Sequence, residues 1–315
     1  MAFNYSLKQL RYLVTTVECG SISEASRRLN ISNPAISSAI KDLESRFDLQ
    51  IFVRHKSNGL MLTPAGSHFF ERAVSLLRDA RAFEQQVNGD SERISGEIVL
   101  ACYEPIASSY MPELLSSFEN RFPSVRVSLH IVNQNKIVEG LRSGAFDLAL
   151  TYSAGLRDTH KSIALLPDLY PRAVLPADHA LANREMLSLS MIAKEPLVLL
   201  DIWPSNQYFI GQFEVAGLRP NIAYKVPSME LVTAFVGQGL GVSILVTLPE
   251  QIQTPNGKRV VTLPLDGALL PSSTVVAWNR DKDLTRLTSE FVNHCKQEIK
   301  LPKHIRPFTP EQVLH

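Results

Sequence analysis

The chain has 315 residues and a mass of 35.1 kDa, which predicts two or three domains because an ordinary domain has roughly 100–200 residues. Apolar residues make up 45% and charged residues 20%, a composition typical of soluble globular proteins that excludes a disordered chain. The formal net charge of +1 favours neither a nucleic-acid partner nor a membrane surface, unless domains of opposite sign cancel.

The cysteines and the N-terminal residues indicate a cytoplasmic protein. Cys19, Cys102 and Cys295 are widely spaced and form no C-x-x-C motif, which disfavours a disulfide framework or a zinc ribbon and fits a reducing cytosol. We expect no signal peptide. The longest apolar run, near 240–248, is far shorter than the roughly 20 residues that span a bilayer.

Apolar residues recur every three or four positions over the first part of the chain, which predicts short helices. The first covers 7–19. A second begins at 21–24 with Ser23 as its expected N-cap, and a third begins at Ser32 and runs to about Phe47. The inner stripe of the third helix is expected to consist of Ile36, Ile40, Leu43 and Phe47.

Two short apolar runs then flank Asn58-Gly59, which is a strong signal for a β-hairpin. Thr63-Pro64 begins a long helix that is expected to reach about Val87 and a length of about 40 Å. Its narrow apolar stripe favours a dimerisation helix over the core of a single domain. Turn-forming residues at 88–91 mark a domain boundary.

From residue 91 onward strands and helices alternate, which predicts an α/β fold with a mostly parallel sheet and right-handed crossovers. Strands are expected at 96–103, 125–132, 147–151, 165–175, 197–200, 222–226, 242–245, 260–263 and 274–278. Helices are expected at 105–122, 136–143, 205–216, 228–237 and 283–300.

Two short helices joined by a tight turn and followed by a hairpin are typical of a winged helix-turn-helix. Such a domain inserts a helix end into the major groove, where short polar side chains reach base edges and basic groups meet phosphates. Residues 1–88 carry eleven basic and eight acidic side chains, an excess of three that permits phosphate binding without proving it. The alternative is that these helices only form a small core. The candidate DNA-binding residues are Ser23, Ser32, Asn33, Pro34, Ser37, Ser38, Lys41, Arg54 and Lys56.

Four stretches of the N-terminal segment carry a more specific pattern. They are Leu7-Lys-Gln-Leu-Arg-Tyr-Leu, Gly20-Ser-Ile-Ser-Glu-Ala with the serine-rich helix that follows, Ile51-Phe-Val-Arg, and Leu62-Thr-Pro-Ala-Gly66. This pattern resembles the LysR-type transcriptional regulators nearly residue for residue over positions 7–66. The length and the strand–helix rhythm of the remaining chain resemble the effector domain of the same family.

The resemblance implies an α/β fold class with an N-terminal winged helix-turn-helix, a long linker helix, and a two-lobed, Rossmann-like effector domain similar to a periplasmic binding protein. It implies a DNA-binding domain at 1–63, a linker and dimerisation helix at 64–90, and an effector-binding domain at 91–315. Lobe I would cover about 91–166 and 270–301, and lobe II about 167–269. The implied partners are a double-stranded DNA operator, a small-molecule effector and further copies of the chain in a homodimer or homotetramer, with no membrane.

The third helix, which begins at Ser32 and corresponds to the recognition helix of the family, departs from the family pattern at two positions. Asn33 stands where the family usually has glutamine, and Ser38 stands where arginine or glutamine is frequent. Both changes alter which base edges the helix can reach. They leave the operator sequence open but not the DNA-binding role.

In an open α/β sheet, ligands bind at the carboxyl ends of strands, next to helix N-termini. Glu104 follows the first strand of the effector domain. If its side chain faces the ligand cleft at these strand ends, a cationic or zwitterionic effector is favoured, with Tyr103 and Trp203 available for cation–π contact. Alternatively, Glu104 only complements the dipole of the helix that it begins. The candidate effector-binding residues are Cys102, Tyr103, Glu104, Pro105, Ile106, Thr151, Tyr152, Asp201, Trp203, Ser205, Ser228 and Met229.

The sequence does not favour an enzyme. Cys102 has no histidine at a spacing that would activate it as a nucleophile and is expected to be a buried residue at a strand end. Residues 237–241 imitate a dinucleotide fingerprint, but they follow a helix and precede a strand, the reverse of the required order. We therefore expect no catalysis, no cofactor and no metal. The competing hypothesis is a solute-binding or metabolic protein whose N-terminal helices only oligomerise.

Overall fold

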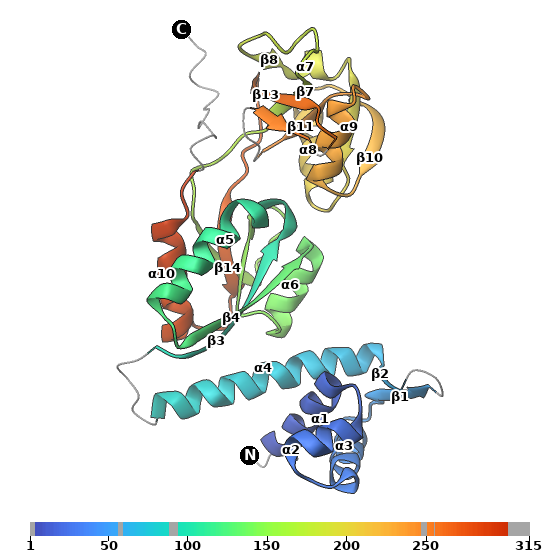
Figure 1. The fold of residues 1–315 in the computed structure, drawn as a ribbon, viewed down its shortest axis with the longest axis vertical. Helices are drawn as coiled ribbons and strands as arrows, with labels where there is room; N and C mark the ends of the chain where they lie inside the picture. The colour runs from blue at the N-terminus through green and yellow to red at the C-terminus, as the bar shows by residue number, and fades with distance from the viewer. Residues whose placement is uncertain (1–3, 56–58, 88–93, 247–250, 255, 302–315) are drawn as a thin grey trace. The chain divides into compact units, whose positions relative to one another are not determined.

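The computed structural model describes residues 4–55, 59–87, 94–246, 251–254 and 256–301. The chain divides into two compact units. One consists of Met1–Gly96 with Arg142–Ala145, and the other of Glu97–Leu141 with Phe146–His315. Figure 1 follows the chain from the blue helices of the first unit to the orange and red elements of the second.

The first unit is helical with a small hairpin. Its helices are α1 (Leu7–Cys19), α2 (Ile22–Leu29), α3 (Asn33–Phe47) and α4 (Pro64–Val87), and its strands are β1 (Phe52–His55) and β2 (Gly59–Leu62). The apolar faces of these elements meet in one core that includes the fully buried Leu13, Ile36, Leu43 and Ile51. Because full burial of such a side chain is worth about 1.5–3 kcal/mol, this core holds the helices in fixed positions.

The N-cap of α2 is Ser21, so the expectation that Ser23 caps this helix is wrong. Ser21 has an extended backbone, and its hydroxyl accepts a hydrogen bond from the Glu24 N–H at 3.1 Å. An N-cap hydroxyl bonds to the N–H three residues later, and Glu24 occupies that position relative to Ser21. Ser23 lies inside the first turn with its side chain exposed.

Helix α3 is connected to the hairpin through one carboxylate. The backbone N–H groups of Ile51 and Phe52 donate to Glu44 Oε1 at 2.7 and 3.2 Å. Strands β1 and β2 pair antiparallel as predicted, but residues 56–58, including the Asn58 of the predicted turn, lie outside the described residues. Phe47 is 41% exposed rather than part of the buried stripe, because its ring packs at the edge of the core against Tyr5 and Phe69.

The start of α4 depends on Thr63 and Gly66. The Thr63 hydroxyl donates to the Gln50 carbonyl at 2.6 Å and accepts from the Gly66 N–H at 2.8 Å. A Cβ added to Gly66 would lie 2.1 Å from the Ile51 carbonyl oxygen, so only glycine fits against this backbone. Farther along α4, Phe83 is 65% exposed. The predicted boundary at 88–91 lies outside the described residues.

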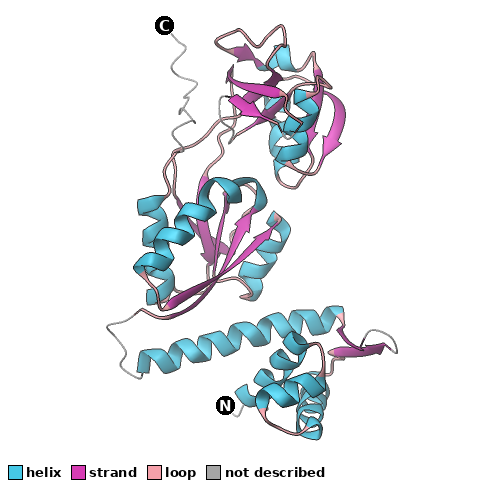
Figure 2. Ribbon diagram, viewed as in Figure 1, coloured by secondary structure: helices cyan, strands magenta, loops and turns pink. Residues whose placement is uncertain are grey.

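The second unit contains two lobes, which we name by their sheets. Lobe I is a five-stranded sheet in the order β4-β3-β5-β14-β6 with three helices. Its elements are β3 (Gly96–Tyr103), α5 (Glu104–Arg121), β4 (Val125–Val132), α6 (Gln134–Ser143), β5 (Leu148–Tyr152), β6 (His160–Ala164), β14 (Thr274–Asn279) and α10 (Arg286–Glu298). Figure 2 shows α5 and α10 on one side of this sheet and α6 on the other. Phe118 of α5 packs edge-on against Phe291 of α10, with ring centroids 4.7 Å apart.

Lobe II is built from the elements between β6 and β14. They are β7 (Arg172–Pro176), β8 (Leu187–Ser188), α7 (Leu189–Ile192), β9 (Pro196–Leu200), α8 (Ser205–Val215), β10 (Asn221–Val226), α9 (Met229–Gly237), β11 (Ser243–Leu245), β12 (Gln251–Gln253) and β13 (Arg259–Asp266). One sheet has the order β11-β7-β13-β12 with β8 beside β13, and β9 pairs with β10. One apolar core, which includes the buried Val198, Phe213 and Val232, joins these strands to α8 and α9.

The expectation of a mostly parallel sheet is wrong. β3 pairs parallel with β5, and β9 with β10, but β14 lies antiparallel to both β5 and β6. β7 is antiparallel to β11 and β13. The reason is that the chain returns from lobe II to lobe I through β14, which enters the sheet of lobe I in the opposite direction.

Two segments, 165–171 and 267–273, carry the chain between the lobes, and we call them the crossover segments (Figure 1). The Ser272 N–H donates to the Leu169 carbonyl at 2.7 Å, and the Leu169 N–H donates to the Ser272 carbonyl at 3.0 Å. The single strand expected at 165–175 is therefore a crossover segment followed by β7. Within the described residues, no helix is long and apolar enough to cross a membrane.

Candidate DNA-binding face and effector cavity

The N-terminal end of α3 presents exposed side chains, most of them polar, on a helix whose opposite side is buried. Ile36, Ile40 and Leu43 bury one side of the helix. On the other side five candidate residues are exposed and Ser37 is half-buried. The exposed candidates are Ser32, Asn33, Pro34, Ser38 and Lys41.

Ser32 and Asn33 have free or weakly bonded side chains that can reach a ligand. Ser32 is the N-cap of α3 by backbone conformation, as expected, but its side chain makes no capping hydrogen bond. Asn33 Nδ2 donates a long hydrogen bond of 3.4 Å to Ser23 Oγ on α2. This contact joins the two candidate residues across the turn between the helices. Polar groups held this loosely can exchange their bonds for base edges at small cost.

The basic residues of α2 are partly neutralised within the domain. Arg27 forms an ion pair with Glu24, and Arg28 Nη1 lies 3.2 Å from Glu18 Oε2. Exposed pairs of this kind are weak, so a phosphate can compete for either guanidinium. The side chains of Arg54 and Lys56, the candidates on the wing, lie outside the described residues.

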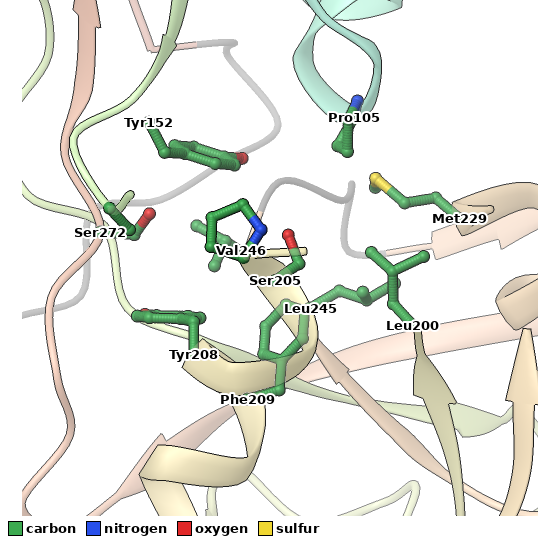
Figure 3. Close-up of a pocket in the computed structure, with 12 residues that line it drawn as sticks. Pro105, Tyr152, Leu200, Ser205, Tyr208, Phe209, Met229, Leu245, Val246 and Ser272 are labelled. Carbon is green, nitrogen blue, oxygen red and sulfur yellow. The ribbon is translucent and has the colours of Figure 1, made fainter. Parts of the chain in front are cut away.

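A cavity lies between the carboxyl ends of β5 and β9, where the two lobes face each other (Figure 3). The empty space at this site is about 390 Å³ when the open solvent at its mouth is included. It is lined by Pro105, Tyr152, Ala154, Leu200, Pro204, Ser205, Tyr208, Phe209, Met229, Leu245, Val246 and Ser272. Of these twelve described residues none is charged, and four carry hydroxyl groups.

The aromatic rings of Tyr152, Tyr208 and Phe209 line the cavity. Figure 3 shows the rings of Tyr152 and Tyr208 one above the other, with Ser272 beside them. Burial raises the pKa of Tyr208 far above its usual range, and the neighbouring Tyr152, Tyr170 and Asp168 raise it further. The Tyr208 hydroxyl therefore stays protonated and donates to the Leu270 carbonyl at 2.8 Å.

Beside the cavity, a hydrogen bond joins the two lobes directly. The Tyr103 and Ser205 hydroxyl oxygens lie 3.0 Å apart, and both residues are buried. Burial raises the pKa of Tyr103 to about 12, against an opposing effect of the bond to Ser205, and the charge of Glu104 raises it further. Tyr103 thus remains a neutral phenol, and the two hydroxyls satisfy each other.

Two sequence models cover most of the chain. One is described as the LysR substrate binding domain and matches residues 91–300, and the other as the bacterial regulatory helix-turn-helix protein of the lysR family and matches residues 7–67. The chain belongs to the LysR family of transcriptional regulators.

Relatives and solved structures agree with this membership. The structure of HinK, a LysR family transcriptional regulator from Pseudomonas aeruginosa, is 42% identical over 93% of this chain and 98% of its own, with a TM-score of 0.63. The uncharacterized HTH-type regulator YvbU of Bacillus subtilis is 28% identical over 83% of this chain and 88% of its own. Full-length CbnR in complex with its target DNA shares the fold, with a TM-score of 0.64, 21% identity and coverage of 93% of this chain and all of its own.

Four of the predicted effector-binding residues of this LysR-family regulator line the cavity, namely Pro105, Tyr152, Ser205 and Met229. Cys102 and Ile106 are fully buried in the core of lobe I instead. Burial raises the pKa of the Cys102 thiol, and its place near the end of β3 agrees with the predicted buried residue at a strand end.

The other candidates lie around the cavity. Thr151 donates to Gln134, Ser228 caps α9 by accepting from the Leu231 N–H at 3.3 Å, and exposed Asp201 accepts from Asn206 at 2.9 Å. Trp203 packs on Gly155 of lobe I, where an added Cβ would lie 2.9 Å from the indole. None of these four residues is among those that line the cavity.

Glu104 is the first residue of α5, and its side chain is exposed and outside the cavity lining. Burial of its surroundings raises the pKa of its carboxyl group. Its place in the first turn fits the expected complement to the helix dipole. Residues 237–241 form the turn that ends α9, which agrees with the structural interpretation of that glycine pattern.

Sequence reasoning missed most of the apolar lining of this regulator. Tyr208 and Phe209 lie three and four positions after Ser205 on α8, so helical periodicity could have placed them on the same face. Leu245 is the last residue of β11 and Val246 follows it, at another junction of the predicted type. Ser272 gave no signal, because it belongs to a crossover segment. Within the described residues, no group of three or more His, Cys, Asp or Glu side chains could hold a metal ion.

Proposed function

We propose that this LysR-family regulator binds operator DNA through the N-terminal end of α3 and the wing. The observation that carries this proposal is the exposed set of short polar side chains, with Ser38 and Lys41 among them, on a helix whose opposite side is buried. A recognition helix needs this combination, because base contacts specify a sequence only when the helix is held in a fixed position. The target DNA named for the CbnR complex supports the same role here.

We further propose that α4 pairs two copies of the chain. Phe83 is 65% exposed and Leu76 37% exposed on this helix, and large apolar side chains at such exposure favour a partner surface. Two paired copies would present two recognition helices to two half-sites of an operator. The functional domains would then be 1–63, 64–90 and 91–315. A protein with this role on operator DNA would act in the cytoplasm and would not be an enzyme.

The proposed effector is a small cationic or zwitterionic molecule held in the cavity between the lobes. The rings of Tyr152 and Tyr208 offer π-faces to a cation, and the lining has no cationic group among the described residues. Glu104 and Asp168 supply negative charge nearby, since their charges raise the pKa values of Tyr103 and Tyr208. A neutral, largely apolar effector is the alternative that the uncharged lining also favours.

A gel-shift assay with the DNA upstream of its own gene tests the DNA-binding proposal. We expect a shift whose affinity falls steeply between 50 and 200 mM salt, by roughly 10³-fold or more if six phosphates are contacted. A chain that shifts no genomic fragment at low salt would instead favour the solute-binding alternative, in which the N-terminal helices only oligomerise.

Three probes that share a phenyl ring and differ in charge test the effector proposal. Phenethylammonium, 2-phenylethanol and 3-phenylpropionate are each added in a thermal-shift assay, in which a ligand at 100 times its Kd adds about 2.7 kcal/mol. We expect the cation to stabilise most and Glu104→Gln to reduce its effect. Stabilisation by the alcohol alone would favour the neutral alternative, and stabilisation by the anion alone would contradict both.

A further inference from the structure

Helix α8 holds one of the two crossover segments through the backbone of a single residue. The Tyr208 hydroxyl donates to the Leu270 carbonyl at 2.8 Å. The Leu270 N–H donates to Gln212 Oε1 at 2.8 Å, and Gln212 Nε2 lies 3.4 Å from the Leu270 carbonyl. Both polar groups of the Leu270 backbone are therefore bonded to side chains of α8.

Gln212 is suited to a fixed attachment because it is completely buried. A side-chain amide that accepts from the N–H and donates toward the C=O of one residue imitates the pairing between two strands. Its Nε2 also lies 3.4 Å from the Tyr208 carbonyl, one turn earlier in α8. The loss of a partner would leave buried polar groups unpaired, so the attachment is costly to break.

The crossover segment that contains Leu270 also reaches the cavity. Ser272, two residues after Leu270, lines the cavity and pairs with Leu169 of the other crossover segment. Tyr208 lines the cavity with its ring and bonds Leu270 with its hydroxyl. One side chain thus touches the space for a ligand and the backbone that connects the lobes.

We propose that Tyr208 and Gln212 are positioning residues that couple occupancy of the cavity to the crossover segments. An occupant that pushes on the Tyr208 ring moves its hydroxyl relative to Leu270. The crossover segments then change their path, and the angle between the lobes changes with them. This inference rests on the proposed effector function, since it describes how that cavity acts on the rest of the chain.

Amide hydrogen exchange on the full chain, without ligand, tests the attachment. Tyr208→Phe keeps the ring and removes the bond to Leu270, and we expect peptides covering 267–273 to exchange about fivefold faster, as the loss of one hydrogen bond implies. Tyr224→Phe removes a hydroxyl from the 40% exposed Tyr224 on β10 and is the matched control. Exchange in α10 is the reference, because general destabilisation would raise it equally.

Met229→Trp then fills the cavity from within, because Met229 points into it (Figure 3). We expect this change to alter exchange at 165–171 and 267–273 by about threefold or more in the native background, and by much less when combined with Tyr208→Phe. Non-additivity of this kind separates coupling from simple support. Equal effects of Met229→Trp in both backgrounds, or unchanged exchange at 267–273 in Tyr208→Phe, would overturn the proposal.

Failure of the proposed coupling can be distinguished from failure of the proposed effector and DNA binding. Neither measurement uses an effector or DNA, so a failure to find a ligand leaves both interpretable. A regulator that shifts its own upstream DNA but has additive exchange effects keeps its function and loses the coupling through Tyr208.

Discussion

The hydroxyl groups of Tyr103 and Ser205 lie 3.0 Å apart and connect the first strand–helix junction of lobe I to the first turn of α8 in lobe II. The sequence predicts both residues as effector-binding, Tyr103 through cation–π contact with its ring. In the structure each hydroxyl satisfies the other, away from water. An effector that enters the cavity must therefore bind beside this pair or replace it.

The first prediction concerns the stability of this pair. Tyr103→Phe and Ser205→Ala each remove one hydroxyl of the pair and leave the other buried without this partner. Each should therefore lower the free energy of unfolding by about 1–3 kcal/mol. The double variant should cost less than the sum, which a double-mutant cycle in urea measures. Tyr110→Phe is the control, because the buried Tyr110 hydroxyl has no hydrogen-bond partner among the described residues, and its removal should be neutral or stabilising. Additive losses would mean that the pair is not a real contact.

The second prediction compares two glycines. Gly66→Ala should destabilise the N-terminal domain by at least about 1–3 kcal/mol, because the new methyl group meets the Ile51 carbonyl at 2.1 Å. Gly211→Ala, in the middle of α8, meets Leu270 Cδ1 at an ordinary contact distance of 3.7 Å and should stabilise by about 0.5–1 kcal/mol through helix propensity. Thermal unfolding of both variants checks the signs, and a tolerated Gly66→Ala would contradict the close approach.

The third prediction concerns pH. His294 of α10 is 2% exposed and its Nε2 contacts Ser117 Oγ at 2.9 Å, while its Nδ1 has no hydrogen-bond partner in the part of the chain that the structure describes. Burial lowers its pKa from 6.5, and Arg121 lowers it further against opposing effects of the Leu114 carbonyl and Glu298. As the pH falls, the unfolded chain therefore takes up the proton first. The contribution of neutral His294 to the free energy of unfolding is fully present above about pH 6.5 and is lost as the pH falls toward the folded-state pKa.

Urea unfolding at pH 7.5 and pH 5.5 measures this loss. His294→Gln keeps a hydrogen-bonding side chain that cannot take up a proton, and it should reduce the difference in unfolding free energy between the two pH values. The exposed His130 supplies the control variant His130→Gln, which should leave that difference unchanged. An unaltered pH dependence in His294→Gln would show that other groups determine it.

The fourth prediction separates two kinds of DNA contact. Lys41→Ala should weaken binding to all sequences and reduce the slope of log affinity against log salt by about one. Ser38→Ala should instead cost about 1–3 kcal/mol on the operator and little on unrelated DNA, if its hydroxyl reads a base edge. Fluorescence anisotropy at three salt concentrations distinguishes the two. A change of salt slope in Ser38→Ala would argue for a phosphate contact instead.

Elements with a strong apolar pattern could be predicted from the sequence almost to the residue. β3 and β4 have the predicted bounds, because Glu104-Pro105 begins a helix directly after β3, and Pro123-Ser124 and Asn133 bound β4. The run at 165–175 misled because its apolar residues continue across a crossover segment. Pro167 and Pro171 within it were the available warning, since proline is excluded from central strands. β6, with three of its five residues exposed, had too few apolar residues to be recognised.

The cavity could be predicted only as a set of junctions. Strand ends and helix starts were located correctly, but which side chain faces the cavity depends on the register of each strand, and a shift of one residue reverses it. Tyr103 ends β3 and Tyr152 ends β5, the neighbouring strand of lobe I. Nevertheless, Tyr152 lines the cavity, whereas the Tyr103 hydroxyl is hydrogen-bonded to Ser205. Leu245 ends β11, Val246 follows it and Ser272 lies in a crossover segment, and only the fold brings them to one cavity.

The position of β14 has a consequence for synthesis of the chain. β14 separates β5 from β6 in the sheet, so β6 has no partner strand until residues 274–279 have left the ribosome. About 120 residues lie between β5 and β14, which take roughly 6–24 s to translate. During that interval the edge of β5 is open and can pair with another nascent chain. Lobe I, although it begins first, is therefore expected to finish folding last, and truncations before residue 274 should yield aggregates rather than an isolated first lobe.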